Sequence, residues 1–488
     1  MEDFTAFVFW PSAPLTDRLV HDALNSLIPP PSVIDSLPKP APGRLLQWAT
    51  YDALDHELTF SHGPQSKVLS SSYVIRKALI RKHFLSRCIR NYLTKRPESV
   101  LSRGVPKTWE FELSFADELD ELWSDELYDL SEEIDKGDPS IWWILKPGMA
   151  DRGMGLRLFH TKEDLEAIFQ EFEQDSDSEL EDEEASDERR RDTSVVTSQL
   201  RHFVIQEYLA KPLLLDPAEV PLNGAIKPAV RDLHGHKFHL RVYCVASRAI
   251  KVYMYDRILA LFSAVPYTSP SKQGGDAEAV GELDLAAHLT NTSLQQERGE
   301  EGVRLLDELI GCHILSAPHS APRRQPPRPH RAMGVAMDPE TMQAARRQQA
   351  ERAEQTQYTT LTAEDIENLK HQVSEVLAET FKAAVEMSVH FQPLPNAFEL
   401  YGIDFVVTHG DSGQLQVNLL EVNSEPAIEL TGPRLTWILE DLFKAIAKTC
   451  VEPFFSKESA PVGNWKVGET NQNLRLSLDM QVRGAQGW

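Results

Sequence analysis

Two neighbouring segments near the C-terminal end of the chain constrain its fold more than any other feature. Residues 401–405 (YGIDF) and 419–426 (LLEVNSEP) are rich in β-branched and aromatic residues. The turn signal HGDSG at 409–413 separates them. This pattern predicts two adjacent β-strands joined by a short connection.

The two predicted strands carry polar side chains on an otherwise apolar surface. Because side chains alternate along a strand, we expect Glu421 and Asn423 to share a face with Val417 and Leu419, and Asp404 lies in the middle of the other strand. Burying three such oxygen donors is costly without a partner, and Mg²⁺ prefers a few protein oxygens completed by phosphates and water. The pattern predicts a magnesium site in a phosphate-handling enzyme. A buried polar network without metal is the alternative.

The composition limits the classes of protein to which the chain can belong. It has 488 residues and a formal net charge of -24, which argues against nucleic-acid binding by bulk electrostatics. Its four cysteines are scattered without metal-binding spacing, as expected for reduced thiols. We find neither a secretory leader nor an apolar run of about 18 residues, so we expect a cytoplasmic protein with no membrane partner.

Strand-like and helix-like segments alternate around two low-complexity inserts. An acidic block at 173–192 predicts disorder, as does a Pro/Arg/His-rich insert at 315–357 with an optional helix in its second half. The rest predicts a mixed α/β (α+β) fold. The expected domains are an N-terminal α/β domain at 1–75, a central domain at 76–207 and a C-terminal domain at 208–455. A C-terminal tail follows at 456–488, and we expect its polar part at 467–488 to be loose. The expected strands include 141–146, 156–159, 203–206, 237–246 and 251–255, and the expected helices include 161–172 and 365–387.

A glycine-rich loop at 146–155 (KPGMADRGMG) is the second informative motif. Its glycines allow backbone amides to approach phosphate oxygens closely. A Walker loop or a dinucleotide fingerprint leads into a helix, whereas this loop leads into the expected strand 156–159. We therefore expect a flap between two antiparallel strands, with Lys146 placed to reach a nucleotide phosphate. A purely structural turn is the alternative.

A cluster of potential cations lies on the expected strand 237–246. Alternation places Lys237, His239 and Arg241 on one face, opposite apolar residues. Three such groups on one face require an anionic partner, and the phosphates of a triphosphate would provide one. Pairing with acidic side chains such as Asp256 is the alternative. The segment 206–209 (QEYL) follows a strand and is expected to form a hinge that bonds an adenine edge.

In their order along the chain, these motifs resemble those of the tubulin–tyrosine ligase family of ATP-grasp ligases, and more narrowly a divergent fungal-type member. The resemblance covers roughly residues 142–430 apart from the inserts, and more loosely residues 73–92. It is carried by the segments WWILKPGMADRGMGLRL, FVIQEYLAKPLLLD, HKFHLRVYCVA, VYMYDRILALFSAVPY, AHLTN and FELYGIDFVV…LLEVNSEPAIEL.

The resemblance implies an ATP-grasp fold, ATP and Mg²⁺ as cofactors, and a role for each matching residue. The ATP phosphates would contact Lys146, Gly148, Arg152, Gly153 and Gly155. The adenine would contact Gln206, Tyr208 and Leu209. Catalytic contacts to the phosphates, the acyl group and the substrate would come from Lys237, Arg241 and Asn291. The metal ligands would be Asp404, Glu421 and Asn423.

The chemistry of the family implies transfer of the γ-phosphoryl group of ATP to a protein carboxylate, followed by attack of an amino-acid amine on the acyl phosphate. Two departures from the family pattern put activity in doubt. Members usually carry an aspartate where this chain has His239 and an arginine where it has Asp256, although Arg257 follows directly. Losing a cation near the transferred phosphoryl group could cost about 10²–10³ in rate.

A basic segment predicts an acidic partner. No Asp or Glu occurs between residues 61 and 97, and eight lysines and arginines at 76–96 alternate with apolar residues in the pattern of an amphipathic helix. An acidic tubulin tail would fit this face and RNA would also satisfy it. The alternative is a helix that packs on its apolar side and exposes its basic side to solvent.

These observations leave three functions open. The first is an ATP- and Mg²⁺-dependent ligase that adds an amino acid to a protein carboxylate, with tyrosine and the C-terminus of α-tubulin as the first specific hypothesis. The second is a ligase-derived, non-catalytic ATP-binding scaffold in a protein or RNA–protein assembly. The third is a ligase that adds glutamate or glycine to tubulin. For it, Arg257 is the obvious extra cation for the donor side chain.

Overall fold

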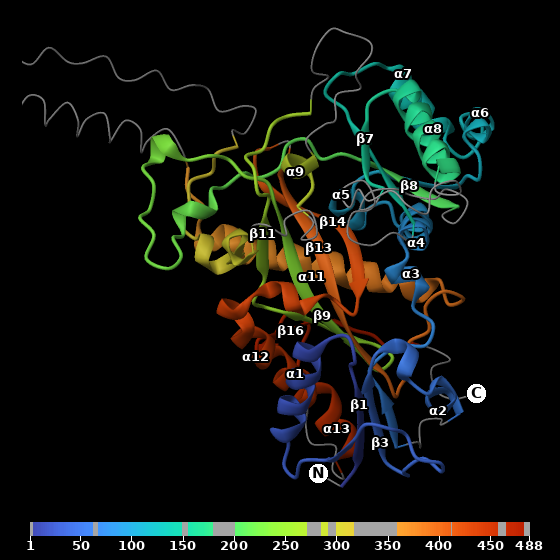
Figure 1. The fold of residues 1–488 in the computed structure, drawn as a ribbon, viewed down its shortest axis with the longest axis vertical. Helices are drawn as coiled ribbons and strands as arrows, with labels where there is room; N and C mark the ends of the chain where they lie inside the picture. Colours follow the sequence, from blue (N-terminus) through green and yellow to red (C-terminus); the bar gives the residue numbers. More distant parts are fainter. Residues whose placement is uncertain are drawn as a thin grey trace, which may run out of the picture.

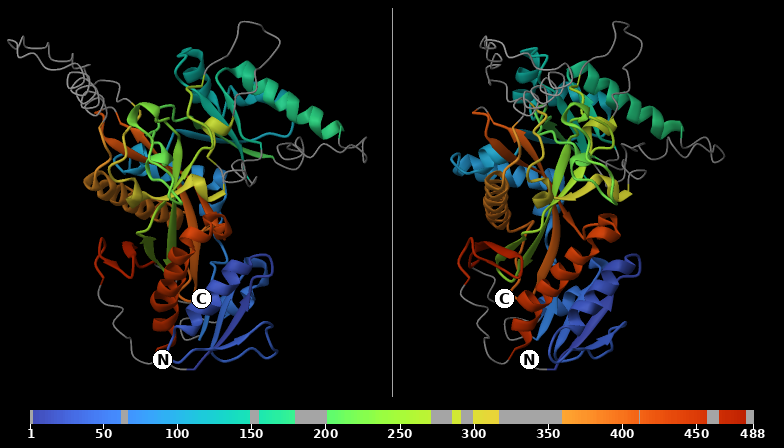
Figure 2. Two further views of the ribbon diagram at one scale, coloured as in Figure 1. Left: turned by 60° about the vertical axis from the view of Figure 1, so that its left-hand side comes forward. Right: turned by 90° about the vertical axis from the view of Figure 1, so that its left-hand side faces the viewer.

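The computed structural model contains three β-sheets in its described part, and they follow one another along the chain (Figures 1 and 2). Their strands come from residues 5–70, 108–207 and 238–479. On this basis we propose domain boundaries near residues 75 and 207. The structure describes residues 3–61, 67–148, 155–178, 201–270, 285–290, 299–316, 359–410, 412–456 and 465–482.

The first sheet is parallel, with the strand order β2-β1-β3-β4. Its strands are almost continuously apolar, as expected for strands covered on both faces. Helix α1 contacts β1 and also helix α12 from the C-terminal part of the chain (Figure 1). The elements are β1 (Thr5–Phe9), α1 (Pro14–Asn25), β2 (Ser32–Ile34), β3 (Leu45–Ala49), α2 (His56–Ser61), β4 (Val68–Ser70) and α12 (Thr436–Ile446).

The second sheet is antiparallel, with the order β5-β8-β6-β7. One face is covered by aromatic and leucine side chains from the helices around it. The other face is contacted by α4 over β5 and β8. The elements are α3 (Lys77–Ile80), α4 (Lys82–Lys95), α5 (Leu101–Gly104), β5 (Thr108–Glu112), α6 (Leu119–Leu122), α7 (Tyr128–Asp135), β6 (Trp143–Pro147), β7 (Arg157–Phe159), α8 (Lys162–Ser178) and β8 (His202–Glu207).

Helix α8 begins where the sequence predicts it and ends later. The backbone N–H of Asp164 donates to Thr161 Oγ1 (3.1 Å), and Asp164 Oδ2 accepts from the Thr161 N–H (3.0 Å), which is the expected capping box. The helix then continues to Ser178 rather than ending at Phe172. The prediction of disorder from residue 173 is therefore wrong for residues 173–178, which belong to α8. The rest of that insert lies outside the described residues, as does nearly all of 315–357.

The third sheet has eight strands. Strand β9 lies at its centre and pairs with β10, β11 and β13, and β13 pairs in turn with β14. The elements are β9 (Phe238–Ser247), β10 (Lys251–Tyr255), β11 (Leu259–Phe262), α9 (Leu285–His288), β12 (Val303–Leu305), α11 (Ala363–Glu386), β13 (Phe398–His409), β14 (Leu415–Ser424), α13 (Glu452–Phe455), β15 (Thr470–Asn471) and β16 (Leu474–Asp479).

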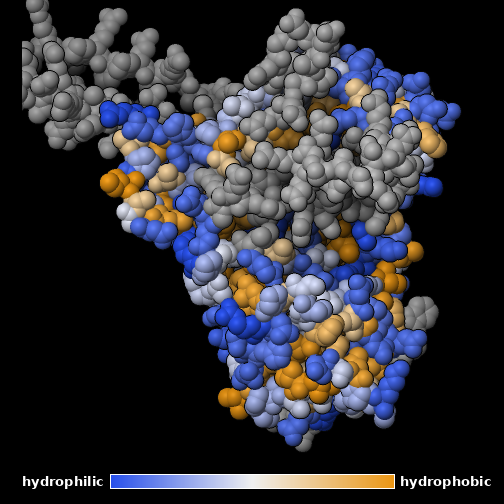
Figure 3. All heavy atoms as spheres, in the orientation of Figure 1, coloured by the Kyte–Doolittle hydropathy of each residue, from blue (hydrophilic) through white to orange (hydrophobic). Residues whose placement is uncertain are grey.

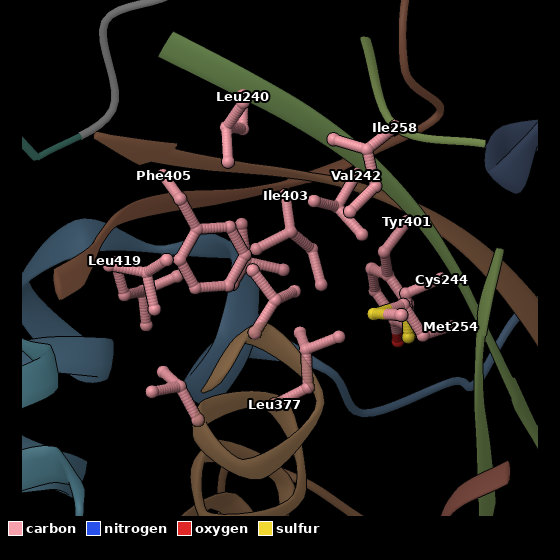
Figure 4. Packing of buried hydrophobic residues seen from close by; sticks show 14 of the residues in the cluster. Leu240, Val242, Cys244, Met254, Ile258, Leu377, Tyr401, Ile403, Phe405 and Leu419 are labelled. Carbon is pink, nitrogen blue, oxygen red and sulfur yellow. The ribbon is translucent and has the colours of Figure 1, made fainter. Parts of the chain in front are cut away.

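Helix α11 covers one face of this sheet and forms the main core with it. The amphipathic pattern predicted this packing. Figure 4 shows Leu377 of α11 beneath Ile403 and Phe405 of β13 and near Val242 of β9. On the opposite face of the sheet, α12 and α1 cover the end that carries Tyr243. This packing leaves the other end of that face for the second sheet.

The C-terminal segment is ordered, which corrects the expectation of a loose tail. Strand β16 pairs with β10 and buries Leu474, Leu476 and Leu478. It also brings Ser477 to Ser374 of α11 (2.7 Å between the hydroxyl oxygens). The described part of the tail therefore extends the eight-stranded sheet.

The surface and the helices of the described residues were compared with what a membrane-crossing helix requires. On the face drawn in Figure 3, hydrophilic residues alternate with hydrophobic patches over the lower half of the molecule. Among the helices of the described residues, none has both the length and the apolar character that crossing a membrane requires.

Candidate functional site

A β-bulge in β14 sets the geometry of the predicted metal ligands. Asp404 pairs with Glu421, but the next pair is Phe405 with Leu419, so Leu420 is an extra residue on β14. The bulge turns Glu421 and Asn423 to the face of Asp404, while Leu419 joins the core under α11. The prediction that Val417 and Leu419 share a face with Glu421 and Asn423 is therefore wrong, because strict alternation fails at the bulge.

The three predicted metal ligands lie together. The Asn423 side-chain amide donates to Asp404 Oδ2 (3.3 Å) and to Glu421 Oε1 (3.1 Å). Arg241 holds Asp404 through two bonds, from Nε to Oδ1 (2.5 Å) and from its terminal nitrogen to Oδ2 (3.0 Å). The pKa of Arg241 is raised by Asp404 although burial opposes its charge. The alternative of pairing with acidic side chains therefore holds for Arg241, although its partner is Asp404 and not Asp256.

The second carboxylate faces lysines. Lys82 Nζ of α4 lies 3.4 Å from Glu421 Oε2. Burial alone would raise the pKa of Glu421, but the charges of Lys82 and Lys146 outweigh it and bring the pKa to about 2. The two lysines therefore favour the ionised form of Glu421, which is the form that binds a cation.

This donor set fits a magnesium ion that is shared with a nucleotide. Two carboxylates and one side-chain amide are typical of Mg²⁺ sites completed by phosphate oxygens and water. Among the described residues, no group of three or more His, Cys, Asp or Glu side chains forms a metal site by itself. Asp404, Glu421 and Asn423 could therefore hold the metal together with bound phosphates.

The lysine at the start of the glycine loop points into the same site. Lys146 Nζ donates to Gln206 Oε1 (2.7 Å), and Gln206 Nε2 donates to Thr108 Oγ1 (3.1 Å). Burial lowers the pKa of Lys146 to about 8, against the opposing effect of Glu421. The structure thus has the Gln206 side chain orienting Lys146. The expectation that Gln206 bonds adenine stays a prediction.

The second lysine is held by the predicted hinge. Lys237 Nζ lies 3.1 Å from the Tyr208 hydroxyl and 4.4 Å from the centre of its ring. The same hydroxyl is 2.9 Å from His288 Nδ1. Burial, reinforced by the charge of Lys146, lowers the pKa of Lys237 to about 7. A buried amine whose pKa lies near 7 is only partly charged at neutral pH, so an anionic ligand beside it stabilises its charged form.

A cavity of about 110 Å³ between the second and third sheets collects most of the predicted residues. Its walls include Lys146, Gln206, Tyr208, Leu209, Lys237, Asp404, Glu421 and Asn423. Arg241 contacts Asp404, which lines this cavity. Gly148 lines the neighbouring cavity, and Gly155 has the positive φ (69°) that favours glycine. Arg152, Gly153 and Asn291 lie outside the described residues.

The two residues that depart from the family pattern have different surroundings. His239 lines the cavity, with Nδ1 2.6 Å from Thr290 Oγ1 and Nε2 3.7 Å from Asp404 Oδ1. Asp256 pairs instead with Lys370 (3.2 Å) and Arg475 (3.0 Å).

Arg257 does not take the place of the missing family arginine. It stacks on Trp437, 4.7 Å from the ring centre, and lies 3.8 Å from Asp441. The sequence left open that Arg257 substitutes for the arginine usual in the family after a small shift, and these contacts do not support that substitution.

Most lysines and arginines of the basic segment 76–96 form ion pairs with acidic residues of the same chain. Its predicted amphipathic helix is present as α4. Ion pairs join Lys82 to Glu421, Arg87 and Arg90 to Glu110, Lys95 and Arg96 to Glu386, and Arg76 to Glu399. These pairs leave less of the segment for an acidic partner than the sequence suggested.

Sequence reasoning missed three residues of the site. Lys82 lies in the basic segment for which the sequence predicts an acidic partner. The sequence of a helix does not show which strand it packs against, so the contact with Glu421 could not be predicted. His288 and Thr290 belong to the AHLTN motif, so their proximity to the predicted Asn291 was the available signal.

Comparison with known proteins gives consistent results. The Tubulin-tyrosine ligase family matches residues 72–308 and 338–459. A Saccharomyces cerevisiae protein described as probable tubulin–tyrosine ligase PBY1 is 32% identical over 481 residues, which are 96% of this chain and 54% of that protein. A Schizosaccharomyces pombe protein described as probable tubulin–tyrosine ligase C12B10.04 is 33% identical over 450 residues, which are 90% of this chain and 88% of that protein. The chain therefore spans about half the length of the first relative.

A solved structure agrees with the fold. It is the C-terminal domain of K. lactis Pby1, described as an ATP-grasp enzyme interacting with the mRNA decapping enzyme Dcp2. It superposes with a TM-score of 0.60 at 25% identity, covering 98% of this chain and 99% of the solved one. The mixed α/β architecture predicted from the sequence is thereby confirmed as an ATP-grasp fold.

Proposed function

Because the chain belongs to the tubulin–tyrosine ligase family and has the ATP-grasp fold, we propose that it binds Mg²⁺-ATP and joins an amino acid to a protein carboxylate. One observation supports this most strongly. Lys146 and Lys237 line the same cavity between the two sheets as Asp404, Glu421 and Asn423. Two cations facing a hard-oxygen set are what a metal-bound triphosphate requires.

Each residue has a defined task in the proposed reaction. Lys146 and Lys237 neutralise phosphate oxygens, and Arg241 fixes the orientation of Asp404. The bound Mg²⁺ would supply charge neutralisation at the transferred phosphoryl group. The bond between the γ-phosphorus and the bridging oxygen of ADP breaks as a carboxylate oxygen of the substrate bonds to that phosphorus. Catalysis would then rest on positioning and electrostatics.

The second step completes the amide. The amine nitrogen attacks the acyl carbon, the carbon–oxygen bond to phosphate breaks, and the proton lost from the amine leaves with solvent. We propose tyrosine and the C-terminus of α-tubulin as the first substrates to test. The name of the family and of the two fungal relatives supports this choice.

Calorimetry with Mg²⁺-ATP on the wild-type protein and on Glu421→Gln tests the site. We expect the variant to bind about tenfold or more weakly, since it removes one ionised metal ligand. Glu375→Gln, an exposed change on α11, is the matched control and should bind like the wild type. Trapping of an acyl phosphate by hydroxylamine, with ATP and tubulin present, then tests the reaction. No binding by the wild-type protein would contradict the proposal.

A non-catalytic scaffold is the second candidate. The K. lactis relative is described as interacting with Dcp2, and His239 and Asp256 replace residues usual in the family. An ATP-binding protein that forms no trapped acyl phosphate but binds a decapping enzyme would support the scaffold over the ligase.

A further inference from the structure

An open groove in the first sheet has no part in the proposed reaction. It has a volume of about 960 Å³ and lies between α1 and β2, at the end of β1. The first sheet lies at the other end of the molecule from α7 and α8 (Figures 1 and 2). Among the described residues, none lines both this groove and the cavity that holds the candidate site. A ligand in the groove would therefore leave the nucleotide site free.

The groove follows an uncovered edge of the first sheet. Strand β2 is the edge strand and, in the part of the chain that the structure describes, it pairs with β1 alone. Val33 and Ile34 of β2 line the groove and are only half-buried. An edge strand of this kind offers free backbone groups and apolar side chains to an extended peptide.

Aromatic and proline side chains are exposed in the groove. Phe9 is 41% exposed, whereas the two residues before it on β1 are at most 5% exposed. The indole N–H of Trp10 donates to the Trp48 carbonyl oxygen (3.0 Å), which fixes the orientation of this half-buried ring. The lining also contains Pro11, Pro14 and Pro38. Aromatic-lined grooves bind proline-rich peptides, because the polyproline II helix is preformed and loses little entropy on binding.

The charged side chains of the groove favour a basic ligand. Its carboxylates are those of Asp17 on α1 and Asp35, which directly follows β2. Asp35 is exposed, and the side chain of Asp17 is 41% exposed and lies 3.4 Å from His21 Nδ1. No lysine or arginine of the described ranges lines the groove. Carboxylates beside aromatic rings suit arginine, whose guanidinium pairs with the former and stacks on the latter.

We propose that this groove docks a proline- and arginine-rich segment of a partner protein in the polyproline II conformation. The prolines pack on Phe9 and Trp10, and the arginines pair with Asp17 and Asp35. An acidic peptide is disfavoured, because the two carboxylates would repel it. This chain itself carries a Pro/Arg-rich stretch at 321–331 (APRRQPPRPHR), so the experiment has to distinguish that stretch from a partner.

Fluorescence anisotropy with a labelled peptide of Arg-Pro-Pro repeats tests the proposal. The titration is made at about 0.15 M salt, where attraction to the acidic surface as a whole is largely screened. Phe9→Ser removes an aromatic contact and Asp35→Lys makes an attractive charge repulsive, so each should weaken binding by about tenfold or more. Asp22→Lys makes the same charge change at an exposed position of α1 outside the lining, and should bind like the wild type.

Two control peptides separate the effect of conformation from that of charge. Glycine in place of proline keeps the charge and removes the preformed helix, whereas glutamate in place of arginine keeps the helix and reverses the charge. Both should bind about tenfold or more weakly. Equal binding of the glycine peptide, or equal affinities of the wild type and Asp35→Lys, would overturn the proposal. Asp35 is exposed, so this variant keeps the test decisive if Phe9→Ser fails to fold.

A protein in which Gly-Ser repeats replace residues 321–331 identifies the source of the ligand. An affinity for the Arg-Pro-Pro peptide equal to that of the wild type supports a partner protein, because the groove is then free in the wild type. Binding that becomes several-fold tighter would show that the chain's own segment occupies the groove, and would overturn the proposal of a partner.

Discussion

Two buried lysines with lowered pKa values define the electrostatics of the candidate site. Burial brings the pKa of Lys237 to about 7 and that of Lys146 to about 8. In the free protein both amines are therefore only partly charged near neutral pH. A triphosphate favours the charged form and raises both pKa values.

Nucleotide binding should consequently take up protons. Affinity for Mg²⁺-ATP should be highest below pH 7 and fall as the pH rises through the pKa values of free Lys237 and Lys146, because above them the ligand must bind together with protons. Calorimetry near pH 8 in buffers of different ionisation enthalpy should measure an uptake of up to about 1.4 protons, because about nine-tenths of Lys237 and about half of Lys146 are neutral there. In Lys237→Met about 0.9 proton of that uptake should disappear. A pH-independent affinity would show that these lysines do not contact the phosphates.

Arg241 should matter for stability as well as for function. It forms two bonds with the buried Asp404, and removing one partner of a buried ion pair typically costs about 3–5 kcal/mol. Arg241→Met should lower the free energy of unfolding by about that amount in urea denaturation. Because Mg²⁺ can replace the guanidinium as the counterion of Asp404, the metal should stabilise the variant more than the wild type. Equal effects of Mg²⁺ on both proteins would argue against a metal at Asp404.

At the scale of elements, the sequence predicted the site strands well where alternation was unbroken. Alternation along 237–241 predicted a shared face for Lys237, His239 and Arg241, and Asp404 of β13 lies beside Arg241 on that face. It failed on β14, because the extra residue Leu420 has no distinctive sequence signature. The pairing of Lys82 with Glu421 could not be predicted either, since it depends on how α4 packs against another sheet.

The C-terminal strand shows a signal that the sequence did contain. Leucines 474, 476 and 478 alternate with polar residues, which is the pattern of a half-buried strand. The polar composition of the segment and its position near the end of the chain favoured the interpretation as a loose tail instead. Leu476 is fully buried, so Leu476→Ala should destabilise the protein by about 2–5 kcal/mol. Gln481→Ala, at an exposed position, should have almost no effect on the denaturation midpoint. A midpoint unchanged in Leu476→Ala would mean that β16 is not docked in solution.

At the scale of the whole molecule, a buried charge pair joins the chain that follows the first sheet to the third sheet. Arg76 pairs with Glu399 at the start of β13, and Glu399 Oε2 also accepts from the Tyr401 hydroxyl (2.7 Å) and the Tyr73 N–H (3.1 Å). Arg76 lies over the ring of Tyr51, 4.1 Å from its centre. The backbone N–H of Tyr51 donates to Glu425 Oε1 (2.8 Å), one residue beyond the end of β14, the strand that carries Glu421 and Asn423. The first sheet is therefore coupled to the strands that carry the site.

Breaking this pair from one side should be worse than removing both charges. Arg76→Met leaves Glu399 buried without its counterion, which should cost about 3–5 kcal/mol, whereas Arg76→Met combined with Glu399→Gln should recover much of that loss. Burial already raises the pKa of Glu399, and losing Arg76 should raise it further. A glutamate whose folded pKa lies above its unfolded value binds its proton on folding, so the penalty of Arg76→Met should shrink as the pH falls towards that raised pKa. Urea denaturation of the wild type, Arg76→Met, Glu399→Gln and the double variant at neutral and mildly acidic pH measures this coupling. Additive, pH-independent losses would show that the two side chains act separately.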